Sequence, residues 1–373
     1  QGVSSAASDV YKRQGMDNPN GSQRYYIGYV DWTGVNGLIE YTGSDKFSAV
    51  LQMGTSSQKY QWEGFYTAAP STLSRKITVD GGYIKGGANF RANDNSNFFF
   101  NVGQIMRPPS FDGVFPNADY DFEEADEILN ESFTSFELGY GFRSSNFKGT
   151  INAYHTVWGD RTLRRSTSID DQGVRIIYSG VEQTHQGIEG EMTWYPSSRL
   201  RINGMFSLGD WKYTKNFQGD AYFIDNNQPA GTTGTLYLDG VKIGDAAQTV
   251  LYLGFDYKLS SKLSVDLDMM SYDNLHGRFG PLDSEFNSAN NRGSIKLPSW
   301  GTADLGATYS FNLLGYDARA RLNVNNLFDE EYLSQSQTNF HNDGGRTWNG
   351  INVENNVYFG KGTTWNLGLN INF

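Results

Sequence analysis

The last nine residues of the chain, 365–373, alternate without interruption between apolar and polar side chains. The apolar members are Trp365, Leu367, Leu369, Ile371 and Phe373. Because successive side chains of a strand point to opposite faces, this segment predicts a β-strand with one apolar and one polar face. Its length suits a membrane, because a tilted strand crosses the hydrocarbon layer in about 9–11 residues.

Other segments alternate in the same way, and their polar faces carry charge. We assign to these faces Glu189, Glu191, Arg201, Asp256, Lys258, Asp266, Arg319 and Arg321. Unpaired charge is very costly to bury, so these faces cannot form a dry core. The pattern predicts an interior filled by water or by another polar body.

Composition narrows the class of protein. Aromatic residues make up 15% of the chain, yet the mean hydropathy is −0.54, so apolar residues are dispersed rather than gathered in runs. Nothing resembles the ~18 consecutive apolar residues of a membrane helix, and a barrel needs none. The net charge of −11 argues against nucleic acid as a partner. We expect an all-β fold, a transmembrane antiparallel β-barrel.

Strands and turns can be placed along the chain. We predict about fourteen strands, at 23–33, 35–43, 46–57, 80–92, 97–106, 133–143, 147–158, 175–195, 199–212, 247–259, 262–275, 299–311, 316–328 and 364–373. Tight turns alternate with long excursions at 58–79, 107–132, 159–174, 213–246, 276–298 and 329–363. Outer-membrane barrels have this asymmetry, with short periplasmic turns and long extracellular loops. The parity predicts a periplasmic C-terminus.

The N-terminal segment differs from the rest. Residues 1–14 show no alternation, and residues 15–23 are polar. A basic region followed by an apolar one, which marks a secretory signal, is missing there. We expect 1–22 to be non-native or disordered, with 1–14 either a tag or junction or a flexible native terminus. Residues 23–373 are then part of the barrel of a longer precursor.

Several short motifs point to one family. The segment 325–332 (NNLFDEEY), followed by a loop and the closing strand, resembles the C-terminal region of TonB-dependent outer-membrane receptors. The segments 133–140 (FTSFELGY) and 187–191 (GIEGE) are similar to two strands of these receptors. The segments 83–90 and 97–109 resemble a hairpin common in receptors of the Bacteroidetes type.

This resemblance implies a barrel of about 22 strands closed by an N-terminal plug. The fourteen strands would be the C-terminal portion of it, without the plug and without the segment that receives energy from the TonB–ExbB–ExbD complex. The charged inner residues would then form a wall that docks the plug. The alternative is that they are solvated in a water-filled lumen or paired across strands. Phe373 would be the terminal aromatic residue read by the barrel assembly machinery.

Chemistry-bearing motifs are scarce. The four histidines have no metal-ligand spacing, Cys is absent, and no nucleophile motif occurs. We therefore expect no metal site, no cofactor and no enzymatic activity. The acidic run between 119 and 127 could bind Ca²⁺, although a solvated acidic face explains it better.

A candidate ligand site lies in the predicted outer loops. Arg161, Arg164 and Arg165 form a basic cluster at 159–174, and Arg278 falls in a later loop. Guanidinium groups match oxyanions bidentately, as an anionic ferric chelate requires. Tyr222, Phe223 and Trp348 could supply a stacking wall. The alternatives are lipopolysaccharide contact for the arginines and a membrane girdle or loop packing for the rings.

These observations favour an outer-membrane receptor that binds a scarce small-molecule ligand, most simply an iron–siderophore complex, and imports it with TonB-derived energy. Outer-membrane lipid and lipopolysaccharide would surround the barrel. Two alternatives stay open. One is a vitamin, haem or oligosaccharide receptor on the same scaffold. The other is a passive fourteen-stranded channel of the fatty-acid type.

Overall fold

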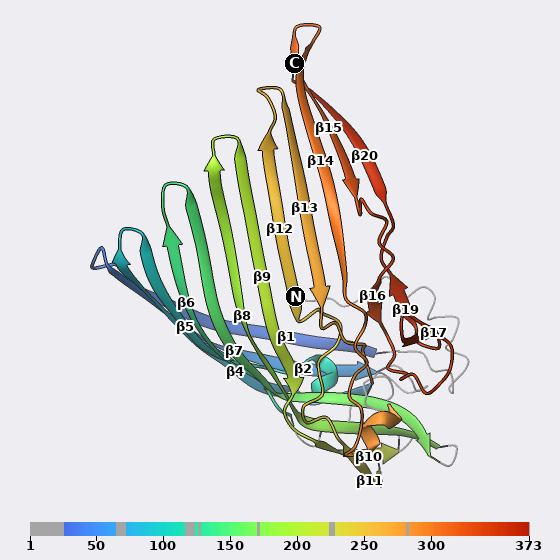
Figure 1. Cartoon of the computed structure of the whole chain (residues 1–373). Helices are drawn as coiled ribbons and strands as arrows, with labels where there is room; N and C mark the ends of the chain where they lie inside the picture. Colours follow the sequence, from blue (N-terminus) through green and yellow to red (C-terminus); the bar gives the residue numbers. More distant parts are fainter. Residues whose placement is uncertain are drawn as a thin grey trace.

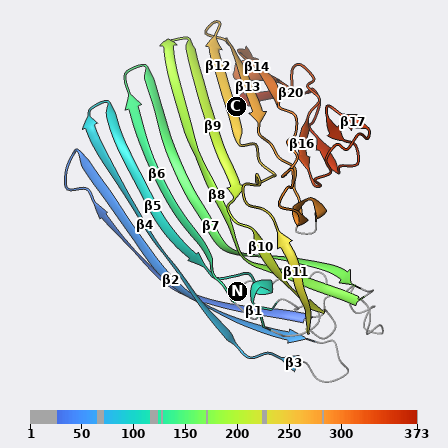
Figure 2. The same cartoon turned by 60° about the horizontal axis from the view of Figure 1, so that its bottom comes forward.

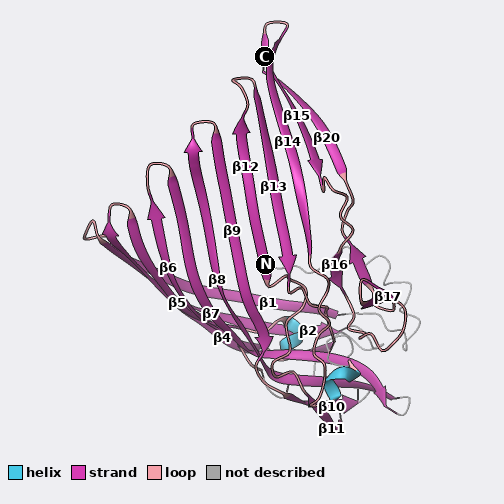
Figure 3. Cartoon of the chain, in the orientation of Figure 1, coloured by secondary structure: helices cyan, strands magenta, loops and turns pink. Residues whose placement is uncertain are grey.

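A computed structural model describes residues 26–64, 72–115, 124–125, 128–169, 172–223, 228–280 and 283–372. Its main element is one 16-stranded antiparallel sheet, in which β3, β10 and β11 branch from a continuous path that runs from β1 to β20. The sheet curves into an open trough with β1 and β20 as its edges (Figure 1, Figure 2). Helix is confined to two short pieces in the described ranges (Figure 3).

The elements follow in chain order. The continuous path contains β1 (Tyr26–Tyr41), β2 (Phe47–Gly64), β4 (Ile77–Asn93), β5 (Ser96–Arg107), β6 (Glu131–Arg143), β7 (Phe147–Ile169), β8 (Gln172–Ser197), β9 (Leu200–Tyr213), β12 (Thr249–Lys258), β13 (Leu263–Asp273), β14 (Trp300–Leu313), β15 (Tyr316–Asn325) and β20 (Thr364–Asn372). The branches are β3 (Thr72–Leu73), β10 (Phe217–Phe223) and β11 (Pro229–Leu236). The loops contain α2 (Phe111–Val114), η3 (Ser284–Asn287), β16 (Leu333–Ser336), β17 (Thr347–Trp348), β18 (Ile351–Asn352) and β19 (Val357–Phe359).

The predicted asymmetry of the connections is confirmed. Tight turns gather at one end of the sheet and long connections at the other (Figure 1). Strand β20 pairs with β15 from Asp317 opposite Asn372 to Asn325 opposite Thr364, so its last described residue lies at the tight-turn end. Phe373 itself lies outside the described residues. None of the helices in the described ranges has the length and apolar character needed to cross a membrane.

Two details of the predicted strand pattern are wrong. The segments 23–33 and 35–43 are not separate strands, because β1 runs through Gly34, which pairs with Ser56 of β2. The continuous path therefore has one strand fewer than the fourteen expected. The loop expected at 159–174 is also wrong, since β7 continues to Ile169 and β8 begins at Gln172.

The hairpin of β7 and β8 extends far beyond a membrane. Strand β8 has 26 residues. At about 3.3 Å per residue it spans roughly 85 Å, whereas a strand tilted by about 45° crosses a 30 Å hydrocarbon layer in about 42 Å. The outer half of this hairpin lies beside β10 and β11 (Figure 1). These strands enclose a buried apolar cluster that includes Val174, Tyr178, Phe217 and Leu236.

The segment 325–332, which carried much of the family resemblance, has a structural role. Asn326 is 5% exposed and has a φ of 50°. Its side chain donates to the carbonyls of Glu330 (2.9 Å) and Lys361 (3.1 Å) and accepts from the Glu330 amide at 2.9 Å. Its carbonyl accepts from Thr363 Oγ1 at 2.7 Å. Asn326 therefore holds together the beginning and the end of the last long loop.

The two faces of the sheet differ in chemistry. One face exposes large apolar side chains, among them Leu251, Tyr257, Leu305, Leu322, Trp365, Leu367 and Leu369. The other face carries polar side chains that hydrogen-bond across strands. Glu137, for example, accepts from Asn101 of β5 at 2.9 Å and from Asn152 of β7 at 3.0 Å. This division confirms the expected arrangement of an apolar outer face and a polar lumen.

Candidate functional site

The charged residues predicted to line the lumen fall into two groups. Arg201 Nε lies 2.8 Å from Asp256 Oδ2, and Arg321 Nη1 lies 2.6 Å from Asp266 Oδ1. These four residues therefore pair across strands, which was the alternative to docking a plug. Glu189 accepts a hydrogen bond from Ser207 at 3.0 Å. Within the described ranges Glu191, Lys258 and Arg319 form no ion pair, so these three remain available to another polar body.

A polar hollow lies toward the tight-turn end of the lumen. It has a volume of about 820 Å³ and is lined by seven neighbouring strands, from β4 to β9 and β12. Its wall includes Glu191, Asn97, Asn203 and Tyr252. Amide and hydroxyl groups can both donate and accept, so this wall can bond to the backbone or side chains of a second polar surface.

At the other end of the lumen a β-bulge reorients Arg161. The register of β7 against β8 shifts on both sides of this residue, and Asp160 has a φ of 57°. Bulges commonly re-aim a side chain in this way. The Arg161 Cζ lies 3.7 Å from the centroid of the Trp158 ring, a cation–π contact. Its Nε is buried and has no hydrogen-bond partner among the residues that the structure describes.

Aromatic and titratable side chains continue from Arg161 down the lumen wall. The rings of His185 and Trp211 lie 5.5 Å apart, and Trp211 Nε1 donates to the Tyr154 hydroxyl at 2.9 Å. These three residues and Glu189 line a hollow of about 370 Å³. The buried Nε2 of His185 also has no partner in the described part of the chain. The wall thus offers ring faces together with unused polar atoms.

Arg161 and Arg278 both lie within electrostatic range of Tyr213, at the outer end of β9. Burial raises the pKa of the Tyr213 phenol, and the charges of Arg161 and Arg278 both oppose that rise. Arg278 also lies 3.7 Å from Asp245. Two of the arginines predicted from the sequence therefore share one neighbourhood at the mouth of the lumen, although 117 positions separate Arg161 of β7 from Arg278.

The predicted cluster of three arginines is divided. Arg164 lies near Asp112 and Arg175 rather than with Arg161, and burial lowers the pKa of its guanidinium to about 10. It lines a pocket of about 180 Å³ with Ser110 and Asp160. For Arg165 the structure describes only the backbone, which pairs with Ile176.

The predicted aromatic wall is not brought together at this mouth. Phe223 packs against the apolar cluster beneath β10, and the backbone of Tyr222 pairs with that of Arg175. Trp348 packs against a separate apolar cluster and meets Phe359 edge to face at 5.1 Å. Phe223 and Trp348 therefore stabilise the outer loops.

His185 and Tyr154 were missed by sequence reasoning. Each stands alone on its strand, and its partners come from neighbouring strands through the register of β7, β8 and β9. The alternation of polar and apolar residues places both on the lumen face. This was the one feature of the sequence that could have indicated them. Within the described ranges no group of three or more His, Asp or Glu side chains is placed to hold a metal ion.

The fold and this lumen define an outer-membrane type of receptor barrel, and comparison with known proteins agrees. The chain matches the family model for the TonB-dependent receptor-like β-barrel over residues 7–327. It therefore belongs to this family, whose members are receptors and transporters rather than enzymes. No curated protein sequence matches the chain.

Solved structures resemble it in fold. The ferric-catecholate import receptor Fiu from E. coli K12 is 15% identical with a TM-score of 0.59, over 93% of this chain and 45% of that chain. The ferric yersiniabactin uptake receptor FyuA from Yersinia pestis is 13% identical with a TM-score of 0.60, over 93% and 47%. The ferric citrate transporter FecA is 11% identical with a TM-score of 0.62, over 93% and 46%. The chain spans about half the length of each.

Proposed function

We propose that this chain is the C-terminal part of an outer-membrane receptor that binds an anionic ligand at the mouth of the lumen and imports it with energy from the TonB–ExbB–ExbD complex. The observation that carries the proposal is Arg161, whose cation is fixed over Trp158 and keeps a buried Nε unused within the described ranges. Arg278 adds a second cation beside Tyr213. In a chain of net charge −11, these cations favour an anion at this place.

The ligand that fits best is an iron–siderophore complex. Such a chelate combines carboxylate, catecholate or similar oxyanions with flat apolar parts. Arginine forks match the oxyanions, and the rings of Trp211 and Tyr154, which line the adjoining hollow, offer faces and edges to the remainder. The three similar solved structures named above are, by name, receptors or transporters of ferric complexes, which supports this assignment.

The lumen wall at the tight-turn end is proposed to dock a plug supplied by the remainder of the protein. Glu191, Lys258 and Arg319 have no ionic partner within the described ranges, and the adjoining hollow is lined largely by amide and hydroxyl groups. A plug that presents complementary polar groups would pair with these three charged side chains and hydrogen-bond to the wall of the hollow. The C-terminus would then be periplasmic, next to the barrel assembly machinery during insertion and surrounded by lipid and lipopolysaccharide afterwards.

Uptake by the full-length protein tests this function. Cells that depend on it are supplied with ferric siderophores, cobalamin, haem or oligosaccharides, with and without TonB. TonB-dependent growth on a ferric siderophore is expected, together with direct binding by the purified receptor. Growth on cobalamin or a glycan alone would show that the siderophore assignment is wrong, while the proposal of a TonB-dependent receptor would stand. Uptake that does not need TonB would favour a passive channel.

A further inference from the structure

Three outer segments that lie far apart in the sequence are joined through the middle one. The segments are 236–243, which begins at the last residue of β11, 283–297, which contains η3, and 333–355 in the last loop. We call 283–297 the central segment. Its contacts on one side reach 236–243 and on the other side reach 333–355.

The first side is both apolar and hydrogen-bonded. Phe286 of η3 is fully buried in the cluster formed with Leu236, Leu238 and Val241. The Tyr237 amide donates to the Phe286 carbonyl at 2.8 Å, and Asn291 Nδ2 donates back to the Tyr237 carbonyl at 2.9 Å. Removing the Phe286 ring would leave a cavity in this cluster, which is among the costliest kinds of core change.

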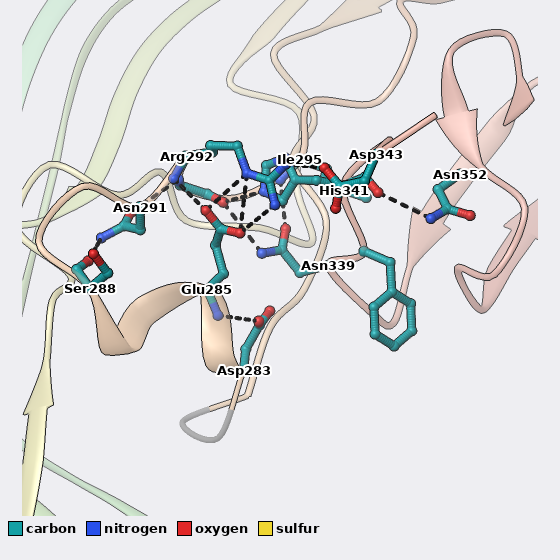
Figure 4. Close-up of polar contacts among 12 residues, drawn as sticks. Asp283, Glu285, Ser288, Asn291, Arg292, Ile295, Asn339, His341, Asp343 and Asn352 are labelled. Carbon is teal, nitrogen blue, oxygen red and sulfur yellow. Dashed lines mark hydrogen bonds and ion pairs between the residues drawn. The ribbon is translucent and has the colours of Figure 1, made fainter. Parts of the chain in front are cut away.

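The second side depends on Arg292. Its guanidinium donates to Glu285 within the central segment at 2.7 Å and to Asp343 of the last loop at 2.6 Å. The close-up shows Arg292 between these two carboxylates (Figure 4). A planar guanidinium can hold two carboxylates in fixed directions, which an ammonium group does less well. Arg292 thus ties the last loop to the central segment.

Side chains of the last loop also bond to the backbone of the central segment. Asn339, which is 5% exposed, accepts from the Ile295 amide at 2.7 Å. His341 Nε2 donates to the Gly293 carbonyl at 2.9 Å. Ile295 and Leu297 also share an apolar cluster with Leu333 and Ile351 of the last loop. The junction is therefore a packed interface rather than a single surface ion pair, which alone would contribute little.

From these contacts we infer that 236–243, 283–297 and 333–355 form one rigid body. The central segment lies between the other two and contacts both, so that these outer segments move together. Only the consequence of this rigidity for ligand binding rests on the proposed function. Because Arg278 lies in the same connection as the central segment and its amide donates to the Ser336 carbonyl at 2.8 Å, a ligand held by Arg278 would bias all three segments at once.

Paired spin labels in the full-length receptor test the inference without any ligand. The chain has no native Cys, so Asp239→Cys and Glu354→Cys place labels on the two outer segments. A single narrow distance distribution is expected. It should broaden in Asn339→Ala combined with Arg292→Ala, which removes the buried hydrogen bond and the ion pair together, and stay narrow in the control Arg346→Ala, an exposed arginine of the same loop.

Hydrogen exchange distinguishes the two sides. Asn339→Ala, which removes the buried acceptor of the Ile295 amide, should lower amide protection in 333–355 at least tenfold and leave 236–243 unchanged, whereas Asn291→Ala should do the reverse. A broad distribution in the unmodified protein, or variants that leave both measurements unchanged, would overturn the inference. Since neither experiment uses a ligand, failure of the siderophore assignment would not affect the result.

Discussion

Arg321 holds Asp266 through two parallel hydrogen bonds, Nη1 to Oδ1 at 2.6 Å and Nη2 to Oδ2 at 2.7 Å, although the two residues lie on strands that are not neighbours. Strand β14 runs between them, and Gly306 is the residue beneath the pair. A Cβ at Gly306 would come within 2.1 Å of Asp266 Oδ2 and 2.4 Å of Arg321 Nη2. The ion pair therefore depends on the absence of a side chain at this position.

Gly306→Ala is expected to destabilise the folded barrel by about 1–3 kcal/mol, because the added methyl group must displace the charged pair. The measurement is urea unfolding of the full-length protein in lipid vesicles. Gly368→Ala is the matched control. Gly368 of β20 pairs with Arg321 of β15, and a methyl group at Gly368 would have no described atom within 4 Å. Equal unfolding midpoints for the two variants would contradict the prediction.

Arg161→Gln is expected to weaken binding of an anionic ligand by about 1–3 kcal/mol, the cost of losing a charge-assisted hydrogen bond. Arg161→Lys should recover part of the loss, because it keeps the charge but lacks the planar fork. Titration of the purified receptor with the ferric siderophore identified by uptake gives the affinities. Unchanged affinity in Arg161→Gln would place the ligand contacts elsewhere, most directly on the plug.

The orientation of the barrel can be read from single-Cys labelling. Asp239→Cys should react with an impermeant maleimide on intact cells, because it lies at the long-connection end of the sheet. Ser261→Cys lies in a tight turn and should react only after the outer membrane is permeabilised. The opposite pattern would invert the proposed topology.

The contact between Glu285 and Arg292 should respond to acid. The adjacent guanidinium holds the pKa of the Glu285 carboxyl at about 2, below its ordinary value of 4.5. A lowered folded-state pKa contributes stability above the ordinary value, and that contribution is lost as the pH falls toward 2. Thermal unfolding of Glu285→Gln should therefore change less between pH 5 and pH 2.5 than that of the unmodified protein. Parallel curves would show that the carboxylate has no such role.

The sequence was sufficient for the class of fold because period-2 alternation reports burial directly. It was insufficient where local composition suggested a break that pairing overrides. The boundary predicted between 33 and 35 falls at Gly34, but this residue pairs with Ser56 inside β1. The loop predicted at 159–174 begins at Gly159 and Asp160, whereas the chain forms a bulge there and continues as a strand to Ile169.

The candidate site was predicted only in part, for a related reason. Arg161 and Arg278 were singled out by their charge, and they do share the neighbourhood of Tyr213. The separation of Arg164 from Arg161 follows from the continuation of β7 as a strand, because side chains three positions apart in a strand face opposite sides, and the prediction of a loop at 159–174 hid this. The meeting of His185, Trp211 and Tyr154 depends on the registers of β7, β8 and β9, and a single sequence does not specify registers.

The contacts of Asn326 have a consequence for chain entropy. They join the start of the last loop to Lys361 and Thr363, so the closure of that loop is fixed by groups at its base. Once the ends of a flexible loop are held, doubling its length costs only about 0.6 kcal/mol. Insertions at its exposed turns, such as 344–345, should therefore leave the barrel almost as stable as before. The loop can diversify in length while the strands on either side keep their register.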